Sequence, residues 1–134
     1  MSLKTLNFLL PAVHVRQTKK RGRGVFTHQP IAENAIIEIA PVIVLSSEER
    51  KLVDKTLLHD YIFEWGEKKN QICMALGLVP IYNHSYSANC EYAMNFKEQI
   101  ICIKAVRNIN ADEELFINYN GDWNEQKKVW FDAK

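Results

Sequence analysis

A chain of 134 residues with a net charge of +1, 47% hydrophobic and 25% charged residues has the composition of an ordinary globular domain. It is long enough to bury a core without disulfide or metal staples, and a charge so near zero argues against a global attraction to nucleic acid or to membranes. No apolar run reaches transmembrane length, and the short apolar patch at residues 8–10 lacks the marks of a signal peptide. We therefore expect one domain over residues 1–134, with its core at about 13–124, in an intracellular, cytoplasmic protein.

The first part of the chain is predicted to form strands interrupted by turns. Residues 13–18 alternate between apolar and polar side chains, as a half-buried strand does. The glycines of RGRG (21–24) break this pattern, and residues 25–27 resume it. Two apolar, β-rich runs follow at 35–40 and 42–45, and Pro41 between them is expected to limit ladder pairing because proline has no N–H to donate.

One helix is predicted after these strands. Ser46 and Glu49 have the spacing of a capping box, in which each side chain bonds the other's backbone N–H. The pattern that follows predicts a helix from residue 47 to about 62, with Val53, Leu57 and Tyr61 on its inward face at i, i+4 and i+8.

The second part of the chain is again predicted to be β-rich. Residues 92–96 and 100–106 flank a short polar turn and suggest a hairpin, and residues 115–119 form a last strand. A weak internal similarity, or echo, relates residues 31–37 to residues 109–115. Each segment has an apolar residue, then a polar turn and then a predicted strand. Short strands with a single main helix define the fold class as α+β, mostly β.

Several isolated features carry little chemistry on their own. The three cysteines form no CxxC pair and no histidine pair has the i, i+4 spacing, so neither a disulfide framework nor a metal site is expected. His84 with Cys90 could pair a base with a thiol nucleophile, but no orienting partner stands at a recognisable spacing. The basic run Lys19–Arg23 could touch phosphates, although a run this short is more often a solvated turn.

Four segments in a fixed order carry the functional signal: GRGVF (22–26), DYIF (60–63), YNHSYSANC (82–90) and EELFINY (113–119). Together they resemble the SET domain, the fold of many protein lysine methyltransferases, and the short span before the NHS segment resembles the compact single-domain viral and bacterial members. Asn118 and Ile117 depart from the Asp and the aromatic residue that are frequent in the family, and no cysteine-rich zinc segment follows the last strand.

The resemblance implies a cofactor, S-adenosylmethionine, and a knot-like C-terminal segment that brings the NHS stretch against Tyr119. The residues it assigns to the cofactor are Gly22, Arg23, Gly24, Phe26, Tyr82, Asn83, His84 and Tyr119. Asn83 could instead be a plain turn cap. No metal is implied.

The resemblance also implies a catalytic tyrosine and a lysine channel. Tyr119 would orient the substrate amine, and Tyr61 would line the same channel, unless it simply packs on the core from the helix. Ile117 would line the channel without holding a water, because it cannot form hydrogen bonds, so products beyond monomethyl-lysine are expected.

The implied activity is methyl transfer to a lysine of a protein substrate, with histones the family's familiar targets and a nuclear location in that case. The alternatives are a catalytically inactive SET-like protein-binding module and a small nucleic-acid-binding domain, of which the near-zero charge disfavours the second. A homodimer is also expected from the resemblance, with Trp123, Trp130 and Phe131 of the tail as its apolar surface.

Overall fold

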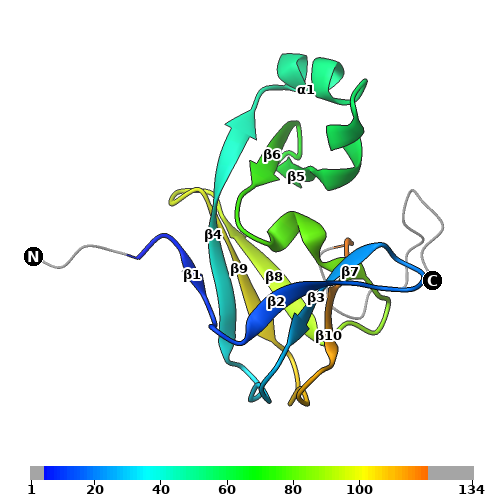
Figure 1. Cartoon of the computed structure of the whole chain (residues 1–134). Helices are drawn as coiled ribbons and strands as arrows, with labels where there is room; N and C mark the ends of the chain where they lie inside the picture. Colours follow the sequence, from blue (N-terminus) through cyan, green and yellow to red (C-terminus); the bar gives the residue numbers. More distant parts are fainter. Residues whose placement is uncertain (1–4, 121–134) are drawn as a thin grey trace, which may run out of the picture.

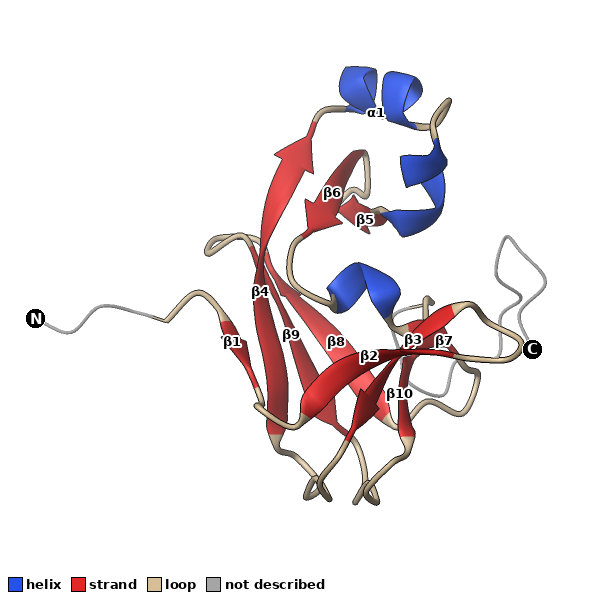
Figure 2. Ribbon diagram, viewed as in Figure 1, coloured by secondary structure: helices blue, strands red, loops and turns tan. Residues whose placement is uncertain are grey.

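The computed structural model describes residues 5–120, which form two β-sheets and a few short helices (Figure 1). The larger sheet has the strand order β5-β6-β4-β9-β8, with β1 also paired to β4. Its strands are β1 (Phe8–Leu9), β4 (Ile36–Leu45), β5 (Phe63–Trp65), β6 (Gln71–Ala75), β8 (Cys90–Asn95) and β9 (Ile100–Ala105). The smaller sheet has the order β2-β3-β10-β7, and its strands are β2 (Val13–Gln17), β3 (Arg23–Thr27), β7 (Asn83–His84) and β10 (Glu114–Ile117). The α+β, mostly β prediction is confirmed (Figure 2).

Strand β4 is one continuous strand, and the expectation that Pro41 separates two runs is corrected. The proline sits where the strand changes partners: residues up to Pro41 pair with β9, and those from Val42 onward pair with β6. Proline has no N–H to donate to a neighbouring strand, but its carbonyl can still accept a hydrogen bond. The Pro41 carbonyl accepts from the Leu76 N–H at 3.0 Å, at the point where the partner of β4 changes. The long strand thereby ties the lobe of β5 and β6 to the rest of the sheet.

The predicted helix over 47–62 is wrong in its extent and in its inward face. The α-helix α1 runs only over Ser47–Val53, and a 3₁₀ helix, η1, follows at Leu57–Tyr61; neither contains a buried residue, and Leu57 is 77% exposed. Thr56 explains the break, because its hydroxyl donates to the Val53 carbonyl at 2.7 Å and accepts from the Leu58 N–H at 3.2 Å. The capping box of Ser46 and Glu49 is confirmed.

The weak internal echo corresponds to a real structural pair. Ile31 and Ile109 exchange two backbone hydrogen bonds, at 2.9 and 2.8 Å, as an isolated antiparallel bridge. In each copy the third residue further on, Asn34 or Asp112, has a positive φ, near 70°. Asn and Asp tolerate this left-handed conformation, so both turns reverse the chain in the same way before β4 and β10.

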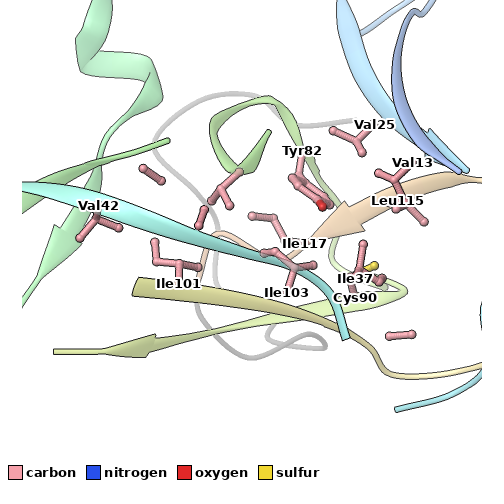
Figure 3. Packing of buried hydrophobic residues seen from close by; sticks show 14 of the residues in the cluster. Val13, Val25, Ile37, Val42, Tyr82, Cys90, Ile101, Ile103, Leu115 and Ile117 are labelled. Carbon is pink, nitrogen blue, oxygen red and sulfur yellow. The ribbon is translucent and has the colours of Figure 1, made fainter. Parts of the chain in front are cut away.

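The hydrophobic core lies between the two sheets. Val13, Val25 and Leu115 point inward from the smaller sheet, and Ile101 and Ile103 face them from the larger one (Figure 3). All five are at most 5% exposed. The smaller sheet therefore rests on a rigid base, and its β7–β10 side carries the polar segments singled out in the sequence. No helix within residues 5–120 is long and apolar enough to cross a membrane.

Candidate active site

The NHS segment and the last strand lie side by side as a parallel pair, β7 beside β10, although 31 residues separate Asn83 from Glu114. Asn83 stands opposite Phe116 and His84 opposite Ile117 in this register. The Ser85 N–H then donates to the Ile117 carbonyl at 3.0 Å. Two polar residues that look like a loop in the sequence therefore form a short strand at the edge of the smaller sheet, which explains how the NHS stretch reaches Tyr119.

Asn89 holds the other end of this arrangement. Its side-chain amide donates to the Glu114 carbonyl at 2.8 Å, and its side-chain oxygen accepts from the Phe116 N–H at 2.8 Å. These two bonds replace strand pairing for β10 beyond the end of β7. Because Asn89 is only 2% exposed, water cannot readily take its place as the partner of these backbone groups. The Asn-Cys pair noted in the sequence thus has a structural role in fixing β10.

His84 positions the backbone of Tyr119. The Tyr119 N–H donates to His84 Nδ1 at 3.0 Å, and the two rings lie 5.1 Å apart between centroids. Burial lowers the pKa of His84, which is 4% exposed, so the ring is neutral at physiological pH. A neutral ring with an accepting Nδ1 carries its proton on Nε2.

The Tyr119 hydroxyl has a fixed orientation. It donates to the backbone carbonyl of Tyr82 at 2.7 Å, and the buried Tyr82 side chain in turn donates to the Glu38 carboxylate at 2.9 Å. Burial, with the phenol of Tyr61 and the Glu114 carboxylate nearby, raises the pKa of Tyr119 to about 12. The phenol is therefore protonated at neutral pH. Because its proton is donated to the Tyr82 carbonyl, its oxygen lone pairs are directed toward hydrogen-bond donors.

A polar cluster joins the GRGVF hairpin to β10. The Asn83 amide donates to the Arg23 carbonyl at 3.1 Å and to the Glu114 carboxylate at 2.8 Å. A Cβ on Gly24 would collide with that carboxylate and would meet the Asn83 amide at 3.0 Å. Gly24 is therefore required for this cluster to close, whereas Gly22 has open space around it and a φ of +70°, which glycine adopts readily.

A cleft of about 590 Å³ opens beside this cluster, within the usual range for small-molecule sites. Its lining comes from the facing ends of β2 and β3 with the turn between them, from η1, from β7 and the segment before it, and from the second residue after β10. The lining residues are Gln17, Arg21, Gly22, Arg23, Asp60, Tyr61, Pro80, Ile81, Asn83 and Tyr119. The Arg21 guanidinium lies 5.2 Å from the centre of the Phe116 ring, which holds the turn over β10.

A second, narrow cavity of about 20 Å³ adjoins the cleft. It is lined by Asp60, Tyr61, Ile62, Phe63, Pro80 and Tyr119. Four of these residues also line the cleft, so the two cavities meet at Tyr119. The narrow cavity has room for little more than one water molecule, and most of its walls are apolar or aromatic.

The structure gathers five of the residues predicted for the site in the lining of the cleft: Gly22, Arg23, Tyr61, Asn83 and Tyr119. Sequence reasoning missed Gln17, Arg21, Asp60, Pro80 and Ile81. Arg21 and Ile81 each stand directly beside a predicted segment, so widening the motifs by one residue would have found them, whereas Asp60 opens the DYIF segment but was given no role.

The other predicted residues lie behind the cleft. Tyr82 and His84 are buried and act on Tyr119 through hydrogen bonds, and Gly24 makes room for the polar cluster. Phe26 lies under the Arg16 guanidinium at 5.0 Å and is not among the lining residues. Ile117 is fully buried in the core and lines neither cavity, so its place in the lysine channel stays a prediction.

The thiol and metal alternatives gain no support from the geometry. Cys90 is fully buried, and burial raises its pKa to about 12, so its nucleophilic thiolate is scarce at neutral pH. Cys73 and Cys102 are also free thiols with raised pKa values. Among residues 5–120, no three His, Cys, Asp or Glu side chains gather in a way that could hold a metal ion.

The fold and the cleft define a class of protein: a small β-rich domain with a cleft suited to a small molecule beside a half-buried, neutral tyrosine. The model of the SET domain matches residues 22–120, and the chain belongs to the SET-domain family. The four ordered motifs therefore predicted the family correctly.

Individual relatives agree with this assignment. The chain is 35% identical, over 121 residues, to the H3 lysine-37 specific histone-lysine N-methyltransferase of Schizosaccharomyces pombe; the match covers 90% of this chain and 77% of that protein. The crystal structure of a candidate histone methyltransferase from Plasmodium falciparum matches with a TM-score of 0.64 and 29% identity, over 83% of this chain and 99% of that one. A structure of ctPRC2, autoinhibited and bound to S-adenosylmethionine, shares the fold with a TM-score of 0.69 and 21% identity, over 85% of this chain and 16% of that one.

The predicted activity and cofactor are thereby confirmed: the chain is an S-adenosylmethionine-dependent protein lysine methyltransferase. Its own residues fit that cofactor. The cleft is large enough, Gly22 leaves the backbone open to a ligand, and Gly24 allows Asn83 and Glu114 to close behind it. The inactive-module alternative is not favoured, because Tyr119, Asn83 and His84 are all present and interconnected.

Proposed function

We propose that this methyltransferase modifies a lysine of a histone or histone-like protein, in the nucleus, with the reaction centred where the cleft meets the narrow cavity. The observation that carries the proposal is the Tyr119 hydroxyl, which lines both cavities with its proton already engaged by the Tyr82 carbonyl. The H3 lysine-37 specificity named for the fission-yeast relative supports a histone as the substrate class.

The cofactor side of the site is assigned to the larger cleft. Gly22, Arg23 and Asn83 line the cleft, and Asn83 is held by its bonds to Arg23 and Glu114. Gly24 lies behind them and makes room for these bonds. The guanidinium groups of Arg21 and Arg23 suit a carboxylate such as that of an amino-acid ligand. His84 and Tyr82 act as supports that keep Tyr119 in place, and Phe26 packs behind the hairpin.

The substrate side is assigned to the narrow cavity. Its volume of about 20 Å³ suits the end of a slender side chain, and its aromatic and apolar walls suit the methylene carbons of lysine. Tyr61 is the aromatic residue of η1 that lines it together with Tyr119. Tyr61 is half-buried and lines both cavities, which favours the channel role over packing on the core. Ile117 is buried in the core, and we propose that it makes the inner end of the channel apolar.

The cofactor, when bound, supplies an activated methyl group, so the protein's task is alignment and desolvation. The Tyr119 oxygen can accept an N–H of the incoming amine, because its own proton is engaged by Tyr82, and this turns the amine lone pair toward the cleft. A free lysine has a pKa of about 10.4, and apolar walls lower that pKa by disfavouring the ammonium form. The neutral amine is the nucleophile, and its proton passes to solvent.

The test is a methylation assay with labelled S-adenosylmethionine and separate core histones, histone octamers and nucleosomes, followed by mass spectrometry of the modified lysine. We expect label on one histone, at a defined lysine. Absence of label on every histone substrate, with folded protein and bound cofactor confirmed in the same samples, would contradict the histone assignment. Label on a non-histone protein from a nuclear extract would replace it.

We also propose that the protein is a single domain, pairs as a homodimer and has no direct affinity for nucleic acid. The tail residues expected at the dimer interface, Trp123, Trp130 and Phe131, lie outside the described residues. Within residues 5–120, Leu52 and Leu57 are 67% and 77% exposed and offer apolar surface that pairing could cover. Sedimentation across micromolar concentrations tests the dimer, and filter binding with duplex DNA tests the absence of nucleic-acid affinity.

A further inference from the structure

Asp60 is the first residue of the DYIF segment, but none of the roles assigned to the site residues accounts for it. It lies next to last in η1, whose start is fixed by the Thr56 cap, and it lines both the cleft and the narrow cavity. It is the one charged residue among the six that line the narrow cavity, beside Tyr61, Pro80 and Tyr119. A carboxylate thus stands where the two cavities meet.

Two neighbouring acids, Asp54 and Glu64, are engaged by cationic side chains, and Asp60 is not. Asp54 accepts from His59 at 2.9 Å and lies 3.6 Å from Arg50, and Glu64 lies 3.4 Å from the same arginine. The Asp60 carboxylate forms no hydrogen bond or ion pair with another residue of the described part of the chain. An exposed, uncompensated carboxylate at the mouth of a narrow channel attracts a cation of matching size.

We propose, on the basis of the proposed function, that Asp60 is a positioning and specificity residue that binds the ammonium group of the target lysine at the channel mouth. The channel admits a slender chain, and a lysine arrives in solution almost entirely as ammonium. The carboxylate therefore captures the abundant form of the substrate, and the aromatic walls beyond it receive the amine after the proton has left.

This arrangement has two opposing consequences. Asp60 tightens substrate binding, but a nearby negative charge also raises the pKa of the bound lysine and delays formation of the nucleophilic amine. The other charged or titratable groups facing this region are Tyr61 and His59 on η1, Arg21 and Arg23 on the β2–β3 turn, Glu114 on β10, and Tyr119. Tyr119, with a pKa of about 12, keeps its proton over the range in which the lysine titrates.

Neutralising Asp60 should therefore move two kinetic parameters in opposite senses. For Asp60→Asn we expect the KM for recombinant histone H3 to rise about fivefold, the upper range for an exposed ion pair. We expect the midpoint of the kcat–pH profile to fall by about half a pH unit, because the bound lysine loses its proton more readily. Asp60→Glu keeps the charge and should restore the wild-type midpoint.

The matched control is Glu67→Gln, which removes one negative charge from the same lobe but lies outside both cavities; it should change neither parameter. Calorimetry with S-adenosylhomocysteine distinguishes the two ammonium groups that could reach Asp60, and its affinity should be equal in wild type and Asp60→Asn.

Four results would overturn the proposal. An unchanged KM and midpoint in Asp60→Asn would remove Asp60 from substrate binding, and a raised KM without a pH shift would mark a merely structural role. Weakened S-adenosylhomocysteine binding with an unchanged histone KM would assign Asp60 to the cofactor instead. Wild-type protein without turnover on any histone would overturn the proposed function itself, and this proposal with it.

Discussion

Asn89 links the stability of the fold to the position of Tyr119, the proposed catalytic residue, and its removal should lower the free energy of unfolding. Asn89→Ala deletes the amide that bonds the Glu114 carbonyl and the Phe116 N–H, both at 2.8 Å. Each backbone group left without its partner in a buried setting costs about 1–3 kcal/mol. Water entering the space left by the side chain offsets part of this, so we expect a loss of about 3 kcal/mol in the free energy of unfolding.

Chemical denaturation and a thermal melt measure this loss. With an unfolding entropy of about 2.1 cal/mol/K per residue, a chain of 134 residues should melt about 10 °C lower. Turnover at a temperature where the variant is folded should also fall, because β10 carries Tyr119 toward His84.

Asn108→Ala is the matched control. The Asn108 side chain also accepts from a backbone N–H, that of Glu33 at 2.8 Å, but at an exposed site. We expect a loss below about 1 kcal/mol there, because water can replace the lost partner. If Asn89→Ala were as mild as Asn108→Ala, the reasoning that the Asn89 amide completes the sheet would be refuted.

Three further predictions concern the site. Gly24→Ala should weaken S-adenosylmethionine binding about tenfold by calorimetry, because the added methyl displaces the Glu114 carboxylate. An unchanged affinity would show that the polar cluster of Asn83 and Glu114 does not contribute to cofactor binding. Burial raises the pKa of Glu38 above 4.5, so the folded state favours the protonated carboxyl. The free energy of unfolding of wild type should therefore fall relative to that of Glu38→Gln as the pH rises above 4.5. Urea denaturation that gives a constant difference between the two proteins from about pH 4.5 to 7 would contradict this. Products should go beyond monomethyl-lysine, because Ile117 cannot anchor a water; strictly monomethyl product at long reaction times would count against this.

Local patterns predicted what local physics determines. The alternation at 13–17, the hairpin of β8 and β9 and the capping box of Ser46 all depend on neighbours within a few residues, and all are confirmed. The extent of the helix was wrong because the Thr56 hydroxyl, rather than the apolar spacing, determines where the turns end. The Pro41 expectation was wrong because the effect of a missing N–H depends on which strand lies beside it.

The site depends on contacts between distant segments, which periodicity does not reveal. Asn83 and His84 show no strand pattern, since two residues are too few for one, and they become a strand only because β10 arrives from more than 30 residues away. The motifs nevertheless predicted which segments meet, because each contains residues with a specific partner: Gly24 for the polar cluster, Asn89 for β10, Tyr119 for the Tyr82 carbonyl. Asp60 has no partner within the described residues, so no pairing pattern identified it.

The most direct test of the account is the turnover of Tyr119→Phe on the histone that wild type modifies. The change removes only the hydroxyl that lines both cavities and donates to Tyr82, so the fold should survive with a loss of about 1 kcal/mol. Under single-turnover conditions with saturating cofactor, we predict a rate lower by a factor of about ten or more, with S-adenosylhomocysteine affinity unchanged. An unchanged rate in a protein of wild-type stability would contradict the claim that the Tyr119 hydroxyl orients the amine.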